Sequence, residues 1–261
     1  MQDTLFYELK SYWENIIQKG ESSPQTERNL LEQLTLLKFA ENKRIFFSIF
    51  NFADFKKEYS TSNTFEVFGI PPEVYEECGT ELFFSSIDTE HSQSMLANNI
   101  HLKGYLEEMQ KEKDVLTFMF LDCGFKFHHG EKGIIRLLRK NNIFETNAKN
   151  QPIRSLSMFQ DVTHLMKGDF YWFRGVFSSS ERTYYMSYRS DTNEFSKKDI
   201  LSEREKEILK YMAEGKQPED IAKILFISKT TINNHRQNML NKLGAKDSTA
   251  LIQLAKLTNL L

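Results

Sequence analysis

The chain has 261 residues, of which 40% are hydrophobic and 27% charged, and it contains five prolines. This composition excludes disordered and collagen-like chains, and the length allows two domains with separate cores. The net charge of −2 excludes a strongly basic or acidic protein, so a surface for a polyanion has to be local.

The start of the chain, Met1–Thr4, lacks the positive cluster and apolar stretch of a secretory signal. No later segment offers the roughly twenty apolar residues that span a bilayer. We therefore expect a cytoplasmic, nucleoid-associated protein without a membrane partner. Cys78 and Cys123 are expected as reduced core thiols, because neither has the paired spacing of metal ligands. Redox sensing by one of them is the alternative.

Two helices are predicted in residues 1–44. Apolar side chains recur at helical spacing from Leu5 to Ile17, and Ser23-Pro24 provides a cap and a first-turn proline for a second helix. We expect these apolar stripes to face a core, with a dimer contact as the alternative.

Strand-forming sequence follows. Aromatic and β-branched runs over residues 44–50 and 53–59 predict a hairpin. Short helical stretches are predicted at 63–68 and 92–110. The glycine and the two prolines between residues 69 and 72 are expected to interrupt the regular structure.

Three long strands are predicted next, over residues 116–128, 133–146 and 153–165, and turn-forming residues separate them. An antiparallel meander is their simplest arrangement. Two strands, a group of short helices and three more strands follow one another in the order of a PAS domain. The segment therefore resembles a PAS domain, and Asp161-Val-Thr163 is similar to the triplet that often closes the last PAS strand. Another α+β sheet domain is the alternative.

A further hairpin is predicted over residues 169–177 and 182–189. It extends the PAS-like domain to residues 45–190, and the polar residues 191–199 are predicted to be a linker. The resemblance implies a sensory role with an unknown ligand. The many Phe and Tyr side chains are expected to form a core, or to line an apolar pocket where a small molecule binds. No cofactor is predicted, because no flavin, haem or metal-ligand pattern supports one.

Residues 200–261 carry a net charge of +3, against −5 for residues 1–199. No acidic residue lies between Asp220 and Asp247, whereas five basic residues do: Lys223, Lys229, Arg236, Lys242 and Lys246. A local basic surface of this kind is typical of a DNA-contacting module. A solvated charged face is the alternative.

Four helices are predicted in residues 200–261. Their start signals are a capping box, a first-turn proline and two further N-cap residues: Ser202 with Glu205, Pro218, Ser228 and Asp247. The second and third helices are separated by three residues and have the dimensions of a helix-turn-helix. The predicted fold class is therefore α+β, with an antiparallel PAS-like sheet and helices followed by an all-α four-helix domain.

The third predicted helix, Lys229–Leu243, has two different faces. At about 100° per residue, one face is apolar and points into a core; it carries Ile232, Met239 and Leu243. The opposite face carries hydroxyl and amide side chains: Thr230, Asn234, Gln237 and Asn241. Amides both donate and accept, so they can pair with adenine in the major groove, while lysines at the helix ends suit phosphates. A polar solvent face is the alternative.

The same region is similar to the LuxR-type (GerE-like) DNA-binding domain nearly from end to end. The matching segments are Leu201-Ser-Glu-Arg-Glu205, Met212-Ala-Glu-Gly215, Asp220-Ile-Ala222, Leu225-Phe-Ile-Ser228, Thr231-Ile-Asn-Asn-His235 and Asn238–Gly244. The resemblance implies that bases are met by Asn233, Asn234 and Gln237. It implies that the DNA backbone is met by Lys229, Thr230, Thr231 and Lys242.

The LuxR-type resemblance also implies a homodimer on an inverted repeat, commonly formed through the fourth helix. One small helix-turn-helix buries too little surface for specific affinity, which makes two copies physically sensible. The family often carries a basic residue where this chain has Asn233, so we expect an unusual base preference.

The preferred function is a ligand- or partner-responsive transcription regulator that binds double-stranded DNA, with RNA polymerase as a further partner. A sigma-factor-like polymerase subunit is an alternative, although the front half lacks a helical promoter-melting region. An acyl-homoserine-lactone-type receptor is a second alternative, although its Trp/Tyr/Asp pattern does not align. An enzyme is not expected, and no catalytic residue or metal site is predicted, because the sequence has no nucleophile elbow, phosphate-binding glycine loop or metal-ligand cluster.

Overall fold

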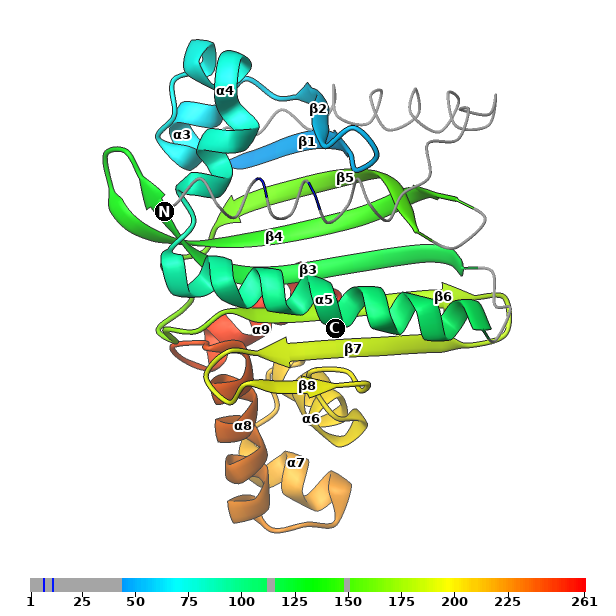
Figure 1. Cartoon of the computed structure of the whole chain (residues 1–261). Coiled ribbons are helices and arrows are strands. Elements are labelled where there is room, and N and C mark those ends of the chain that lie inside the picture. Colours follow the sequence, from blue (N-terminus) through cyan, green and yellow to red (C-terminus); the bar gives the residue numbers. More distant parts are fainter. Residues whose placement is uncertain (1–6, 8–10, 12–43, 112–115, 148–150) are drawn as a thin grey trace.

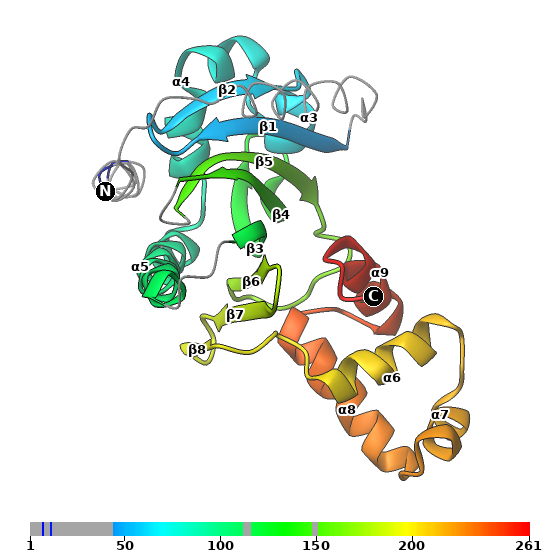
Figure 2. The ribbon, with the colours of Figure 1, turned by 90° about the vertical axis from the view of Figure 1, so that its right-hand side faces the viewer.

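The computed structural model describes Tyr7, Ser11 and residues 44–111, 116–147 and 151–261. This part of the chain contains an antiparallel sheet of eight strands in the order β2-β1-β5-β4-β3-β6-β7-β8. Helices α3 to α5 lie on one side of the sheet, and the C-terminal helices α6 to α9 lie on the other (Figure 1, Figure 2). The predicted α+β class is confirmed, while the two predicted N-terminal helices lie outside the described residues.

Five strands form the first part of the sheet. The predicted hairpin is confirmed as β1 (Ile45–Asn51) and β2 (Lys56–Ser60), and β1 also pairs with β5 (Pro152–Asp161). The predicted meander is confirmed as β3 (Leu116–His129), β4 (Gly133–Thr146) and β5, which pair in chain order.

The last strand of the meander is shorter than predicted, because the chain turns after Asp161 instead of continuing to Leu165. Asp161 Oδ1 accepts hydrogen bonds from the backbone nitrogen of Thr163 at 2.9 Å and from its hydroxyl at 2.6 Å. This local pairing competes with the sheet ladder and ends the strand. The apolar residues Val162 and Leu165 are then free to pack against the C-terminal helices.

Three helices connect β2 to β3. The predicted α3 (Thr64–Phe68) and α5 (Thr89–Lys111) are confirmed, but α4 (Pro72–Ser85) was not predicted. Pro72 is the first residue of α4, where the missing N–H removes no intrahelical hydrogen bond. The proline that interrupts the chain therefore also begins a helix.

The second predicted hairpin is confirmed as β6 (Trp172–Ser179) and β7 (Thr183–Arg189). The segment predicted to be a polar linker contains a short strand, β8 (Glu194–Ser196), that pairs with β7. Residues 194–196 thus extend the sheet toward the C-terminal helices.

The four predicted C-terminal helices are confirmed as α6 (Glu203–Ala213), α7 (Pro218–Leu225), α8 (Lys229–Leu243) and α9 (Ser248–Leu257). Their predicted caps are also confirmed. The side chains of three N-cap residues accept a hydrogen bond from the backbone three positions later: Ser202, Ser228 and Asp247.

Side chains of β3, β4 and β6 alternate between the two sides of the sheet. The side that faces α4 and α5, here called the inner side, carries Cys123, Arg139 and Phe173, which are cross-strand neighbours. The side that faces α6 to α9, here called the outer side, carries Leu138 and Trp172. Each strand therefore contributes alternately to two separate cores.

The second core is shared between the sheet and the C-terminal helices. Leu138, Val162 and Trp172 from the sheet part cluster with buried residues of the helices, including Ile208 and Leu251. The C-terminal helices are therefore packed onto the sheet in a continuous apolar contact.

The two cysteines have different surroundings. Cys123 is a buried thiol, as predicted, and burial raises its pKa to about 12. The prediction of a core position is wrong for Cys78, which is exposed on α4. Among the described residues, no helix is both long and apolar enough to cross a membrane, and no group of His, Cys, Asp and Glu side chains is arranged to hold a metal ion.

Candidate nucleic-acid interface

Helices α7 and α8 are joined by a tight turn. Phe226 ends α7 in the left-handed region at φ 54°, and its side chain is 95% exposed. Ser228 Oγ then accepts a hydrogen bond of 3.0 Å from the backbone nitrogen of Thr231, which caps the start of α8. The first turn of α8 contains no acidic residue, so its remaining N–H groups are available to an anion.

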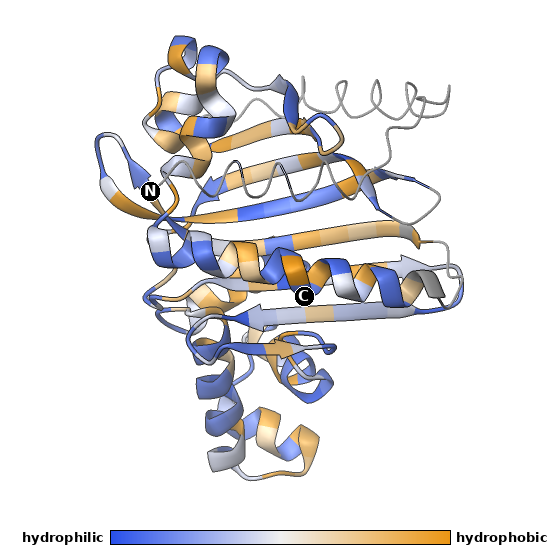
Figure 3. Ribbon diagram, viewed as in Figure 1, coloured by the Kyte–Doolittle hydropathy of each residue, from blue (hydrophilic) through white to orange (hydrophobic). Residues whose placement is uncertain are grey.

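The two faces of α8 lie as the sequence predicts. Ile232, Met239 and Leu243 are at most 1% exposed and anchor the helix in the second core. The opposite face is exposed and uncharged, and includes Thr230, Asn234, Gln237, Asn238 and Asn241. Figure 3 shows α8 as mostly hydrophilic along its length.

The amide side chains of this exposed face contact one another. Gln237 Nε2 donates a hydrogen bond of 2.9 Å to Asn241 Oδ1, one turn along the helix. Asn234 is exposed one turn before Asn238, and Asn233 is half-buried at the edge of the face. The structure thus brings the three residues predicted to meet bases, Asn233, Asn234 and Gln237, onto one continuous strip.

Two of the predicted backbone-contacting residues, Lys229 and Lys242, are paired with acids. Lys229 Nζ lies 2.5 Å from Glu219 Oε1, and this hydrogen bond lowers the pKa of the exposed Glu219 carboxyl. Lys242 Nζ lies 2.7 Å from Oε2 of the buried Glu205, which also belongs to the capping box of α6. Lys242 therefore links α8 to α6, a contact that sequence spacing alone did not indicate.

The C-terminal end of α8 is capped by the sheet part of the chain. Gly244 ends the helix at φ 64°, and its carbonyl accepts hydrogen bonds from the backbone nitrogens of Lys167 at 2.9 Å and Gly168 at 3.1 Å. Arg189 donates a hydrogen bond of 3.2 Å to the carbonyl of Asn241. A Cβ atom on Gly168 would lie 2.7 Å from Gly244 Cα, so this approach requires a glycine.

A buried ion cluster holds β6 to the C-terminal helices. Arg174 forms a two-pronged contact with Asp199, with Nε–Oδ1 at 2.6 Å and Nη2–Oδ2 at 3.0 Å. Arg174 Nη1 also donates a hydrogen bond of 2.9 Å to the carbonyl of Thr258, at the end of α9. Lys206 of α6 is the second cation on Asp199, at 2.9 Å. Burial raises the pKa of Asp199, but the hydrogen bonds from Arg174 and Lys206 outweigh it and lower the pKa overall.

Asp122 is a second acid close to Arg174, and it lacks the short contacts that Asp199 makes. Its Oδ2 is 3.7 Å from Arg174 Nη1, and its Oδ1 is buried without a hydrogen-bond partner. Burial raises the pKa of Asp122 to about 7, against the lowering effect of Lys140 and Arg174. Near neutral pH the Asp122 carboxyl is therefore protonated in part of the molecules and ionised in the rest.

We expect Asp122→Asn to stabilise the protein by about 4 kcal/mol at pH 8 and by only about 1–2 kcal/mol at pH 5, since one pKa unit corresponds to about 1.4 kcal/mol. The folded chain keeps the proton up to about pH 7, whereas an unfolded aspartate ionises near pH 4. The folded state thus holds the extra proton between these values, and the parent loses stability as the pH rises through them. Asparagine does not titrate and removes that loss. Urea unfolding at both pH values measures the difference, with the exposed Asp220→Asn as the control; an unchanged pH dependence in Asp122→Asn contradicts the assignment.

Comparison with known proteins supports the assignment of the C-terminal helices. The family described as "Bacterial regulatory proteins, luxR family" matches residues 199–255. The spore germination protein GerE of Bacillus subtilis is 38% identical over 68 residues, which are 26% of this chain and 92% of GerE. The regulatory protein SdiA of Escherichia coli is 47% identical over 61 residues, and the oxygen regulatory protein NreC of Staphylococcus aureus is 29% identical over 153 residues. The chain spans only 25% of SdiA and 64% of NreC.

Among solved structures, a phage VqmA–DPO complex aligns over 91% of this chain and 92% of its own, with 15% sequence identity and a TM-score of 0.30. At so low a score the superposition assigns neither a fold nor a ligand to this chain. The match to GerE includes 92% of that protein, and the luxR family match falls on residues 199–255, which contain α6 to α8 and most of α9. Through these residues, the chain belongs to the luxR family of bacterial regulatory proteins.

Proposed function

We propose that the chain is a sequence-specific transcription regulator in which α8 enters the major groove of double-stranded DNA. The observation that carries the proposal is the exposed amide strip of α8, centred on Asn234 and Gln237, on a helix whose opposite face is buried. A helix anchored on one side and lined with amides on the other suits the donor and acceptor pattern of base edges.

In this proposal Asn233, Asn234 and Gln237 contact bases. The backbone contacts come from Lys229, Thr230, Thr231 and Lys242. Thr230 and Lys229 are exposed at the start of α8, where the helix dipole and the free N–H groups also favour a phosphate. Lys242 is 32% exposed and would reach a phosphate while it still holds Glu205.

We further propose that residues 45–190 form a PAS-like sensory domain, preceded by residues 1–44 and joined through residues 191–199 to a DNA-binding domain at 200–261. Support comes from the order of two strands, three helices and three strands between Ile45 and Asp161. The extra hairpin of β6 and β7 then brings this domain into contact with α6 to α9.

We also propose that the DNA-bound form is a homodimer, since a single helix-turn-helix buries little surface on DNA. The apolar stripe of α9 is already buried within the chain. A dimer formed through α9 would therefore use its exposed side, which carries Thr249, Gln253 and Lys256.

Genomic footprinting with the full-length chain, followed by binding assays on the recovered sequence, tests the proposed function. We expect Asn234→Ala and Gln237→Ala each to weaken binding by about 1–3 kcal/mol and to relax preference at one base pair. Lys229→Ala should weaken binding to all DNA sequences alike. It should also reduce the salt dependence of the binding constant by about one released counterion.

Lys229→Ala is a better control than Lys242→Ala, because loss of the Lys242 ammonium would leave the buried Glu205 carboxylate without that partner. Equal losses on every sequence for all three variants would contradict the base-reading roles. No binding to duplexes of any sequence would refute the proposed function.

A further inference from the structure

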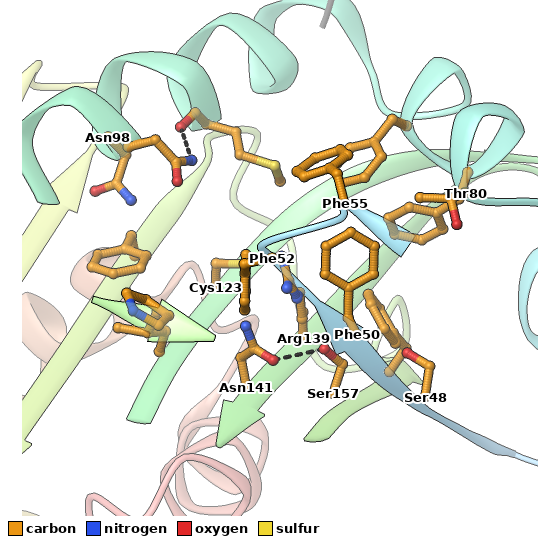
Figure 4. Close-up of a pocket in the computed structure, with 18 of the residues that line it drawn as sticks. Ser48, Phe50, Phe52, Phe55, Thr80, Asn98, Cys123, Arg139, Asn141 and Ser157 are labelled. Atoms are coloured by element: carbon orange, nitrogen blue, oxygen red, sulfur yellow. Dashed lines mark hydrogen bonds between the residues drawn. The ribbon is translucent and has the colours of Figure 1, made fainter. Parts of the chain in front are cut away.

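A cavity lies between α4, α5 and the inner side of the sheet (Figure 4). The centres of water-sized molecules can occupy about 80 Å³ of it, and one water needs about 10–15 Å³ by the same measure. The cavity is therefore large enough for several waters or for one compact organic molecule.

Most of the cavity wall is apolar. Most of its aromatic residues come from β1, the following turn, α4 and β5, and these include Phe50, Phe52, Phe55, Phe83, Phe84 and Phe159. Flat apolar walls of this kind favour a flat or branched apolar ligand body. No aspartate or glutamate is among the described residues that line the cavity.

A short polar row crosses the floor of the cavity. Ser48, Ser157 and Asn141 are direct cross-strand neighbours on β1, β5 and β4, so their side chains lie next to one another on the inner side. Ser157 Oγ donates a hydrogen bond of 2.6 Å to Asn141 Oδ1 (Figure 4). This bond orients the Asn141 amide so that its nitrogen points away from Ser157, where it can donate to a ligand.

Arg139 lies beside this row, two residues before Asn141 on the same strand. Its guanidinium has no carboxylate partner in the described part of the chain, and its Nε is buried without a hydrogen bond. Its guanidinium lies over the ring of Phe159, whose centre is 5.7 Å from Cζ. Arginine stays protonated in proteins, so a positive charge is held in the cavity wall.

The polar neighbours of Arg139 do not neutralise this charge. Burial raises the pKa of the Cys123 thiol to about 12 and raises the pKa of Tyr171 as well, so both groups are uncharged near neutral pH. Asp122 is adjacent to Cys123 in the sequence, but strand alternation places it on the outer side with Arg174. A buried charge without a counter-charge is costly, and the cavity leaves room for one to enter from outside.

We propose that this cavity binds a compact organic carboxylate, with its carboxylate on Arg139 and its apolar body against the phenylalanine rings. The guanidinium fork matches a carboxylate in two parallel hydrogen bonds, and Asn141 offers a further donor. The other cation of the described lining, Lys57, is already paired with Glu76 at 2.8 Å. One cation without a carboxylate partner and a small volume fit a one-ring carboxylate better than a polyphosphate or nucleotide. The inference rests on the proposed sensory role of residues 45–190 and names the class of its ligand.

Calorimetric titration of the full-length chain with matched pairs tests this inference: benzoate against benzamide, and phenylacetate against phenylacetamide. We expect a carboxylate to bind about ten- to a hundredfold more tightly than its amide, because a charged hydrogen-bonded pair is lost in the amide. Arg139→Met should abolish this preference. Lys140→Gln, which removes a positive charge from the next residue on the opposite side of the sheet, should keep it.

The thermal midpoint without added ligand separates a ligand-binding arginine from a structural one. Arg139→Met should leave this midpoint unchanged or raise it, because the variant removes a charge that nothing in the cavity balances. The inference is overturned if no carboxylate is preferred over its amide, if Arg139→Met keeps the preference, or if that variant lowers the midpoint.

Duplex binding by the same samples distinguishes the two proposals. A parent protein that binds its footprinted sequence but prefers no carboxylate refutes only the ligand class. A parent protein that binds no duplex refutes the proposed function itself.

Discussion

Arg174→Ala is expected to lower the free energy of unfolding by about 3–5 kcal/mol, because it leaves buried carboxylates without their main partner. Arg174 is 7% exposed and provides both contacts to Asp199 and one to the carbonyl of Thr258. Lys206 remains on Asp199 in the variant, but it is 20% exposed and comes from the same helical part of the chain. The direct ionic link between β6 and the C-terminal helices is therefore lost.

Guanidinium chloride unfolding followed by circular dichroism measures this loss. The matched control is Lys197→Ala, which removes a cation from an ion pair with Glu108 in which both side chains are about half exposed. Exposed pairs contribute about 0–1 kcal/mol, so the control should be nearly neutral. Similar losses in Arg174→Ala and Lys197→Ala would show that the buried cluster does not hold the two parts together.

Trp172→Ala is expected to cost about 3–5 kcal/mol, because it opens a void in the core shared by the sheet and the C-terminal helices. Trp172 is fully buried in that core. The indole lies against Gly124, where a Cβ atom would be 2.4 Å from the ring nitrogen. The void would therefore open between β3 and the C-terminal helices. The backbone of β3 at Gly124 forms one wall of this void, so neighbouring side chains can fill it only in part.

Trp172→Phe is the control for this prediction. The indole nitrogen is buried without a hydrogen-bond partner, so phenylalanine removes no hydrogen bond and keeps most of the apolar volume. We expect this variant to cost about 1–2 kcal/mol in the same unfolding measurement. If alanine is no worse than phenylalanine, the shared core is not what stabilises the packing of the helices on the sheet.

The elements that sequence predicted best are those specified by local signals. Helix α8 has the predicted bounds, Lys229 to Leu243, because Ser228 caps it and Gly244 ends it in a left-handed conformation. Strand β4 also has its predicted bounds, because turn-forming residues flank it on both sides. The exposed and buried faces of α8 followed from helical periodicity alone.

The features that sequence did not predict depend on distant contacts. Strand β8 has only three residues and lies within a mostly polar stretch, and it is held by pairing with β7. The apolar residues after Asp161 continue the strand pattern in the sequence, but in the structure they pack against helices some forty or more residues later in the chain. The same holds for the site, since the pairing of Lys242 with Glu205 spans 37 residues.

The cavity also could not be predicted from the sequence. Alternation along β4 could place Arg139 and Asn141 on one side of the sheet, but not decide which side faces α4 and α5. That assignment depends on how β4 pairs with β3 and β5 and on where the unpredicted helix α4 packs. The position of a lone arginine inside a phenylalanine-rich wall is therefore visible only in three dimensions.

Two carbonyls at the end of α8, those of Asn241 and Gly244, receive hydrogen bonds from the sheet part of the chain. The donors are Lys167, Gly168 and Arg189. A helix whose last carbonyls lose their donors frays from that end. Separation of the two parts would therefore unwind the last turn of α8 as well as move the helix. The ordered length of α8, and not only its position, is thus coupled to how closely the sheet part of the chain holds it.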